Sequence, residues 1–385
     1  MKLNTDALSW RDSFNFRMLV DEGLLIGRIL NHYKHFPQSS ACLALVAFPF
    51  LTVVEHDSIP FLNRRFGLAL QPKDRRLTII RHMTKSLNSK SIDFFEYERE
   101  AHEVIGALNR RFYSNIPWLG SLIRPFQKNV GIAYFNGIPA YATYSVAHLL
   151  TKNSPALLGQ SDHTFEKEIG YEAGVSGAML FKIADCLIGD HKLYEVPEFV
   201  TYATDWKYED LAAPLKNKGV EDDAVFFFFS ELLLLLSSVS VLRQSGFLED
   251  AAYLKFSSLS LDHVTHSIDA FSAYGRSGRI TQPLPKSFLD EVGALLARAD
   301  NKFVKKAHPL RNAMMHYDFN KKLVPDSAID FGTQDILSAA AQNVLQISGD
   351  EYANEVYRIR DRLIQAIAEL ISFPEYDSVK SPRKL

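Results

Sequence analysis

The chain has 385 residues, of which 47% are hydrophobic and 12% aromatic, so it is long and apolar enough for two packed domains. Its formal net charge of -2 excludes general electrostatic attraction to phosphate, and a nucleic acid would need a local basic patch. The two cysteines, Cys42 and Cys186, have no C-x-x-C spacing, and the chain starts without a secretory signal pattern, so we expect a reduced, cytoplasmic protein.

The first half of the chain contains two predicted helices, around residues 13–33 and 93–112. The second opens with Asp93 and Glu96 at the spacing of a capping box, in which two side chains bond backbone N–H groups at the start of a helix. We interpret residues 1–205 as a mostly helical N-terminal domain whose role the sequence does not indicate.

A small β-hairpin is predicted within residues 130–146. There, Asn136 and Gly137 separate two runs of aromatic and β-branched residues, which is the strongest short-range signal for a hairpin turn. Pro139 weakens the second strand, because proline has no N–H group for the ladder.

Two apolar stretches raise the question of a membrane span. Residues 224–242 carry Glu231 as their only charge, and a carboxylate at the centre of a bilayer is costly. The run at 41–54 is too short to cross and is interrupted by Pro49. We therefore predict a buried helix at 224–242 and no contact with a membrane.

A helical bundle is predicted in the second half. Residues 206–223 are polar, contain a proline and a glycine, and are interpreted as a linker. The bundle is assigned to 224–373, and a basic, disordered tail to 374–385. Its four helical segments have an apolar period near 3.6 and lie at 222–244, 249–274, 286–322 and 349–372.

Start signals refine two of these segments. Ser348 and Glu351 form a capping box before the last one. Pro309 interrupts the third segment and is predicted at the first position of a new helix, where a missing N–H group has no effect. This would place the stretch "HPLRNAMMHYDF", residues 308–319, in the first turns of that helix.

Arg311, Asn312 and His316 form the candidate site within this stretch. Attack of a ribose 2′-OH on its phosphate needs a group that takes a proton near pH 7 and a cation for the charge on the phosphoryl oxygens, and histidine and arginine fit these roles. On a helix Arg311 and His316 point about 140° apart, whereas Asn312 and His316 share a face. Either the arginine swings back across a turn, or the groups converge from two protomers.

The sequence "RNAMMH" near the start of a late helix in a predicted four-helix bundle resembles the HEPN superfamily of RNA-cleaving domains, over roughly residues 220–373. The resemblance implies a metal-independent endoribonuclease that acts without a cofactor and leaves a 2′,3′-cyclic phosphate. It implies a composite site in a homodimer, with Arg311 and His316 as catalytic residues and Asn312 as the polar member. A toxin, defence or stress-response context, with an antitoxin or regulatory partner, belongs to the same expectation.

An acidic residue from an earlier helix often accompanies HEPN sites. Glu231 is one candidate, because a lone carboxylate in so apolar a segment needs a partner, and Arg311 or His316 could provide it. Asp262 or Asp269 could serve instead. A different class of function stays open as well, in which the bundle is a non-catalytic module that binds RNA or protein and the motif is the solvated side of a helix.

Overall fold

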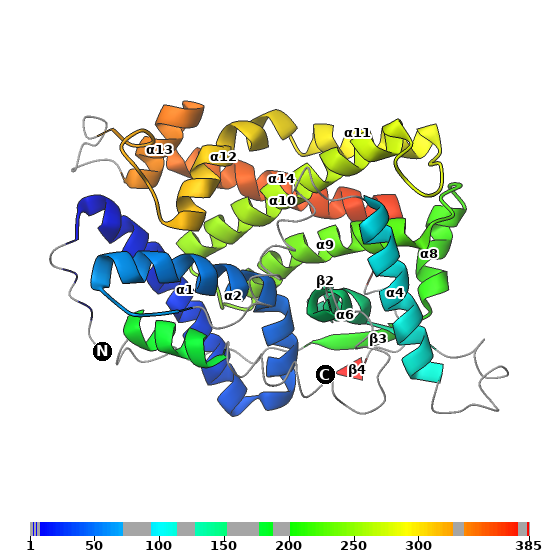
Figure 1. Cartoon of the computed structure of the whole chain (residues 1–385), viewed down its shortest axis with the longest axis horizontal. Coiled ribbons are helices and arrows are strands. Elements are labelled where there is room, and N and C mark those ends of the chain that lie inside the picture. Colours follow the sequence, from blue (N-terminus) through cyan, green and yellow to red (C-terminus); the bar gives the residue numbers. More distant parts are fainter. Residues whose placement is uncertain are drawn as a thin grey trace.

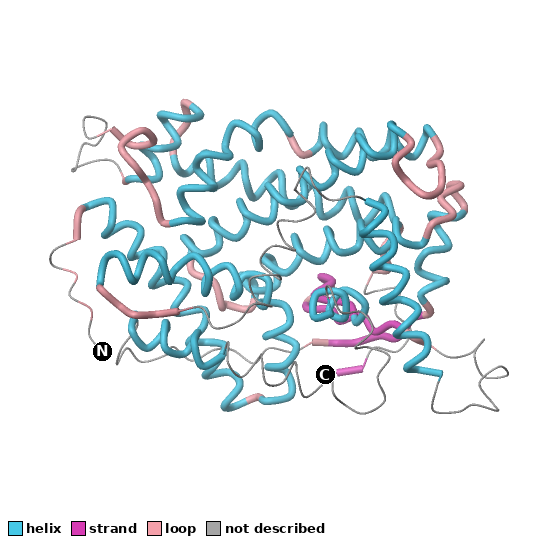
Figure 2. The backbone as a smooth tube through the Cα atoms, viewed as in Figure 1, coloured by secondary structure: helices cyan, strands magenta, loops and turns pink. Residues whose placement is uncertain are grey.

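The computed structural model describes residues 8–71, 94–113, 128–151, 177–187, 201–325, 335–375 and 383–384, together with Leu3 and Thr5. This part of the protein is mainly α-helical, as expected, with one small sheet (Figure 2). One apolar core runs through it and contains buried side chains from both halves of the chain.

Six helices of the second half form the bundle along one side of the protein (Figure 1). The long helices α9 and α10 pack against each other and against α14. Shorter helices cover them, with α11 against α10 and α14 and with α13 between α12 and α14. The bounds are α9 Asp223–Gln244, α10 Asp250–Ser277, α11 Lys286–Arg298, α12 Asn301–His316, α13 Ile336–Leu345 and α14 Gly349–Ile371.

Local capping chemistry explains several of these ends. Asp222 accepts a hydrogen bond from the Ala224 N–H at the start of α9, at 2.8 Å. The predicted capping box of Ser348 and Glu351 is confirmed at the start of α14. Gly278 ends α10 with φ of +70°, a conformation that glycine adopts without a steric penalty.

The predicted third segment is divided differently from the expectation. The break falls at Asp300, whose side chain caps the Phe303 N–H at the start of α12, while Pro309 lies inside that helix. A proline in a helix removes one hydrogen bond, and here the packing of α12 against α10 and α13 keeps the helix continuous. The prediction that 308–319 occupies the first turns of a helix is therefore wrong, since Arg311 and His316 lie in its last turns.

Two long helices of the first half pack under one end of the bundle (Figure 1). They are α1, Trp10–His35, and α2, Pro37–Phe66. Helix α1 packs against α2 and α10, and α2 packs against α9 and α12. The expected helix at 13–33 is thus confirmed as part of α1. Pro49, expected to interrupt the run at 41–54, lies inside α2.

The predicted hairpin is confirmed and is part of a larger sheet. Strand β1, Val130–Phe135, pairs antiparallel with β2, Ile138–Ala142. Asn136 and Gly137 both have positive φ in the turn, and the register shifts where Tyr134 faces Pro139. Strand β3, Tyr202–Trp206, pairs with the other edge of β1, and β4, Arg383–Lys384, pairs with β3. We expected the tail at 374–385 to be disordered. Residues 383–384 instead form a strand that pairs with β3.

Two further helices flank the sheet and the bundle. Helix α4, Phe94–Tyr113, confirms the helix expected at 93–112 and packs against α6, Thr143–Thr151, and against α9. Asp93, its expected cap, lies outside the described residues. Another helix spans 177–187.

The segment expected to be a linker contains a helix. Residues 208–216 form α8, Tyr208–Lys216, which packs against α9 and α14. Its side chains Tyr208, Leu211 and Leu215 are buried in the common core. The division of the chain into two domains stays a prediction.

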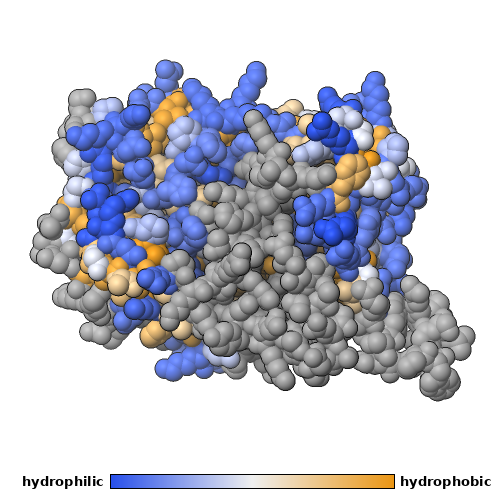
Figure 3. Space-filling model, in the orientation of Figure 1, coloured by the Kyte–Doolittle hydropathy of each residue, from blue (hydrophilic) through white to orange (hydrophobic). Residues whose placement is uncertain are grey.

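Two described helices are long and apolar enough to cross a membrane by length and composition, at 43–66 and 223–244. Most of the apolar stretch of each helix is buried inside the protein, as is also typical of a core helix in a water-soluble protein. The surface over the bundle in the view of Figure 3 is mainly hydrophilic, with small hydrophobic patches. The cytoplasmic location stays a prediction.

The contact between α1 and the start of α10 gives a pH-dependent prediction. Burial, and then repulsion by Glu249, raises the pKa of Asp21 from its usual 3.8 to about 6. Because this pKa is higher in the folded state, the stabilising contribution of protonated Asp21 is fully present below pH 3.8 and is lost as pH rises through about 6. We expect Asp21→Asn to remove this part of the pH dependence and to raise the free energy of unfolding at neutral pH.

Urea unfolding measured across the region between pH 3.8 and 7 tests this expectation, with the exposed Asp290→Asn as the matched variant. If the free energy of unfolding changes with pH in the same way in Asp21→Asn and in the wild type, Asp21 does not titrate in this range.

Candidate functional site

The sequence motif lies on the last turns of α12. The helix ends after His316, where Tyr317 takes a left-handed backbone with φ of 49°. The C-terminal end of a helix dipole is negative and attracts cations. The free N–H groups that bind phosphate at the start of a helix are therefore not available to this motif.

Arg311 points into the protein. The residue is 5% exposed, and its Nη2 atom lies 2.6 Å from Oδ2 of Asp262 on α10. Its Nη1 atom donates a hydrogen bond to Oδ1 of Asn312, at 2.6 Å. Burial lowers the pKa of Arg311, and the neighbouring carboxylates of Asp262 and Asp57 oppose that shift. Arg311 is thus held as a buried, paired cation.

Asp262 contacts two histidine side chains as well as the Arg311 guanidinium. Nδ1 of His308 lies 3.0 Å from Oδ1 of Asp262. Nδ1 of His266 bonds to the Asp262 backbone carbonyl at 2.8 Å and lies 3.5 Å from the same Oδ1 atom. The rings of His266 and His308 meet edge to face, with centroids 6.0 Å apart. A carboxylate that is 2% exposed is thereby surrounded by three basic side chains.

His316 points in a different direction. Its side chain is 46% exposed, and its Nδ1 atom lies 3.4 Å from Oδ1 of Asp57 on α2. Asp57 also lies 3.4 Å from Nδ1 of its neighbour His56. A half-exposed imidazole held against a buried carboxylate is an arrangement that suits transfer of a proton to or from a bound molecule.

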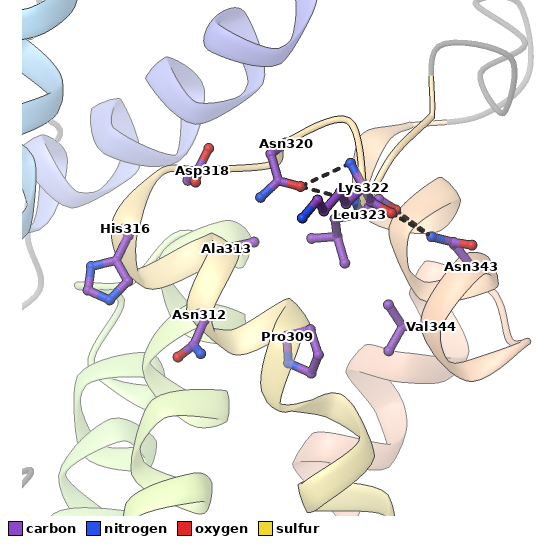
Figure 4. A pocket seen from close by; sticks show the side chains of 10 residues that line it. All are labelled: Pro309, Asn312, Ala313, His316, Asp318, Asn320, Lys322, Leu323, Asn343 and Val344. Atoms are coloured by element: carbon purple, nitrogen blue, oxygen red, sulfur yellow. Dashed lines mark hydrogen bonds between the residues drawn. The ribbon is translucent and has the colours of Figure 1, made fainter.

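The outer side of α12 borders an open pocket of about 460 Å³ (Figure 4). Asn312 and His316 project from the same side of the helix, as their spacing predicts (Figure 4). The other walls come from the segment after α12 and from α13. Within that segment Asn320 accepts hydrogen bonds from the backbone N–H groups of Lys322 and Leu323, and Asn343 of α13 donates to the Leu323 carbonyl. The remaining lining residues are Pro309, Ala313, Asp318 and Val344.

Glu231 belongs to another polar cluster. It accepts a hydrogen bond from the Tyr97 hydroxyl and lies against Nδ1 of His148, each at 2.8 Å. Its partners are therefore on α4 and α6 and are not the expected Arg311 or His316. Asp269, the other alternative, pairs with Lys305 on the exposed side of the bundle at 2.9 Å. Of the three acids considered, Asp262 is the one that meets the motif.

No group of three or more histidine, cysteine or acidic residues suited to a metal ion occurs within the described ranges. Comparison with models of protein families, with curated proteins and with solved structures found no match.

The sequence did not point to Asp57, His56 or His308 as neighbours of the motif. His56 and Asp57 lie in the string "EHD" at 55–57. They are so far from residue 316 along the chain that the sequence does not indicate the contact. His308 is three residues before Arg311 on the same helix, and its proximity to Asp262 depends on how α10 packs. The packing of the helices brings this cluster together, and no local sequence pattern predicts it.

Proposed function

We propose that the protein is an endoribonuclease that cleaves RNA at the pocket beside His316. The support is the half-exposed imidazole of His316, which borders an open pocket and faces the buried carboxylate of Asp57. A carboxylate of this kind fixes the ring and stabilises the imidazolium that forms when the ring takes a proton. The resemblance of "RNAMMH" to HEPN ribonucleases supplies the substrate class.

In this proposal His316 accepts the 2′-OH proton of the nucleotide whose phosphodiester is attacked. The product is a 2′,3′-cyclic phosphate, and the reaction needs no divalent metal. Asn312 lies one helical turn before His316 on the same side and can donate its amide N–H groups to the phosphate. Lys322, at the opposite wall of the pocket, adds an exposed positive charge.

Arg311 has a supporting role in the described state. Its ion pair with Asp262 keeps the guanidinium inside the protein, and its hydrogen bond orients the Asn312 amide. Direct contact of Arg311 with a phosphate would require that pair to open. A homodimer in which two copies of α12 meet, and an antitoxin or regulatory partner, stay predictions from the resemblance.

A second function is favoured by the same burial of Arg311. A guanidinium that is 5% exposed and already paired is unavailable for stabilising a transition state. In that reading the bundle binds RNA or another protein through the His316 pocket without chemistry.

The test is incubation of the purified protein with mixed RNA in the presence of EDTA. We expect His316→Ala to lower the cleavage rate by about 10²–10⁴-fold, which is the usual contribution of a general base. His35→Ala, which changes an exposed histidine at the end of α1, is the matched control. RNA binding without cleavage by the wild type would favour the binding module, and neither binding nor cleavage would contradict both functions.

A further inference from the structure

We propose that α2 completes the site within the same chain, with His56 as a second proton-transferring imidazole and Asp57 as the residue that positions both rings. The inference rests on the proposed function for the chemistry, and on the geometry of three side chains for the arrangement. The resemblance implies that a second protomer completes the site. In this inference, His56 of the same chain completes it instead.

A single carboxylate oxygen connects the two rings. Oδ1 of Asp57 lies 3.4 Å from Nδ1 of His56 and 3.4 Å from Nδ1 of His316. The side chain of Asp57 is 3% exposed, whereas those of His56 and His316 are 34% and 46% exposed. The two imidazoles thus stand on the surface side of one buried anion. Because each ring faces that anion through Nδ1, its Nε2 atom remains for a bound molecule.

Packing holds α2 in place beside the motif. Val53 of α2, Leu259 of α10 and Met315 of α12 form a small apolar cluster of their own. The rings of Phe61 and Tyr317 also contact each other, with centroids 5.6 Å apart. Contacts therefore lie on both sides of Asp57 in the sequence of α2, so the carboxylate is fixed relative to His316.

The charge of Asp57 acts on several buried groups around it. Asp57 attracts the Arg311 guanidinium, and its repulsion adds to burial in raising the pKa of Glu22 on α1 and of Tyr317. His56 and His316 are the imidazoles that lie next to it among the described residues.

Two imidazoles match the proton balance of RNA cleavage. As the O2′–P bond forms, His316 takes the proton of the 2′-OH group. As the P–O5′ bond breaks, His56 gives a proton to O5′, which leaves as a free hydroxyl group. One proton is taken up and one is released, so no further reactant is needed. Asp57 stabilises whichever ring is charged.

The first test is cleavage by single variants and by their mixture. We expect His56→Ala and His316→Ala each to lower kcat by about 10²–10⁴-fold with little change in KM, because both act in the chemical step. Mixing equal amounts of the two variants should restore no activity, since both imidazoles belong to one chain. Recovery of activity in the mixture, or a wild-type rate for His56→Ala, would overturn the proposal.

The second test needs no RNA. In the wild-type protein with neutral rings, nitrogen NMR should show the proton of both His56 and His316 on Nδ1, facing Asp57. In Asp57→Asn the amide group can turn its own N–H toward a ring, so the nitrogen shifts of both histidines should change. Asp290→Asn, on the exposed side of α11, is the matched variant and should change neither.

The two tests separate the possible failures. In one outcome, the nitrogen shifts of both histidines change in Asp57→Asn while the wild-type protein does not cleave RNA. That result would confirm the positioning role of Asp57 and reject both the proposed function and the catalytic role of His56. Wild-type rings that carry the proton on Nε2 would reject the arrangement itself, even if Asp57→Asn fails to fold. RNA cleavage with unresponsive rings would leave the proposed function standing and reject this inference.

Discussion

Arg311→Met is expected to lower the free energy of unfolding by about 3–5 kcal/mol, because it leaves the Asp262 carboxylate buried without its closest cation. That carboxylate is 2% exposed and lies 2.6 Å from the guanidinium. His308, whose Nδ1 atom lies 3.0 Å from Oδ1 of the same carboxylate, keeps one hydrogen bond to it. Urea unfolding monitored by circular dichroism provides the measurement.

Two further variants control for this interpretation. Arg311→Met combined with Asp262→Leu should recover much of the stability, because the double change removes both charges. Arg298→Met, which breaks an exposed pair with Glu369, should cost about 1 kcal/mol or less. A similarly small effect of Arg311→Met would mean that Arg311 is not buried in solution and is free to contact RNA. The stability of each Arg311 variant must therefore be known before its cleavage rate is interpreted.

Lys255→Met is the second change with a large expected effect, again about 3–5 kcal/mol at neutral pH. Nζ of Lys255 lies 2.6 Å from Oε1 of Glu22, and the two side chains are 1% and 0% exposed. The ammonium group also stands 3.9 Å from the centre of the Tyr317 ring, and the Tyr317 hydroxyl donates a hydrogen bond to Glu22. The substitution would leave the Glu22 carboxylate without its cation.

The pH dependence of Lys255→Met adds a direct check. Burial raises the pKa of Glu22 even with Lys255 present, and removing that cation should raise the pKa further. Because protonated Glu22 is tolerated in the core, the variant should lose less stability at acidic pH than at neutral pH. Lys305→Met, in an exposed pair with Asp269, should cost about 1 kcal/mol or less at either pH. A pH-independent loss in Lys255→Met would contradict a charged Glu22.

The Arg311–Asp262 and Lys255–Glu22 pairs and the proposed site lie near one another, where α1 and α2 contact the end of α12. Tyr317 bonds to Glu22, and directly before it His316 faces Asp57, so α1 and α2 both contact the end of α12. Arg11 of α1 also donates a hydrogen bond to the Val324 carbonyl, at 2.7 Å. The first two helices therefore hold the segment that forms one wall of the pocket. This is a structural role for residues that the sequence assigned to a domain of unknown function.

Local spacing by itself determined the helical class, the hairpin at Asn136 and Gly137, the capping box at Ser348, and the shared face of Asn312 and His316. These features depend on residues a few positions apart, whose geometry the period of a helix or a turn fixes. The sequence also indicated that Arg311 and His316 diverge on a single helix.

Only the tertiary structure decided which groups meet. It paired Arg311 with Asp262, turned Glu231 toward Tyr97 and His148, and brought Asp57 to His316. It also kept α12 continuous through Pro309, which moved the motif from the start of a helix to its end. Partners on separate helices depend on how the apolar faces pack, and the same local pattern is compatible with many packings.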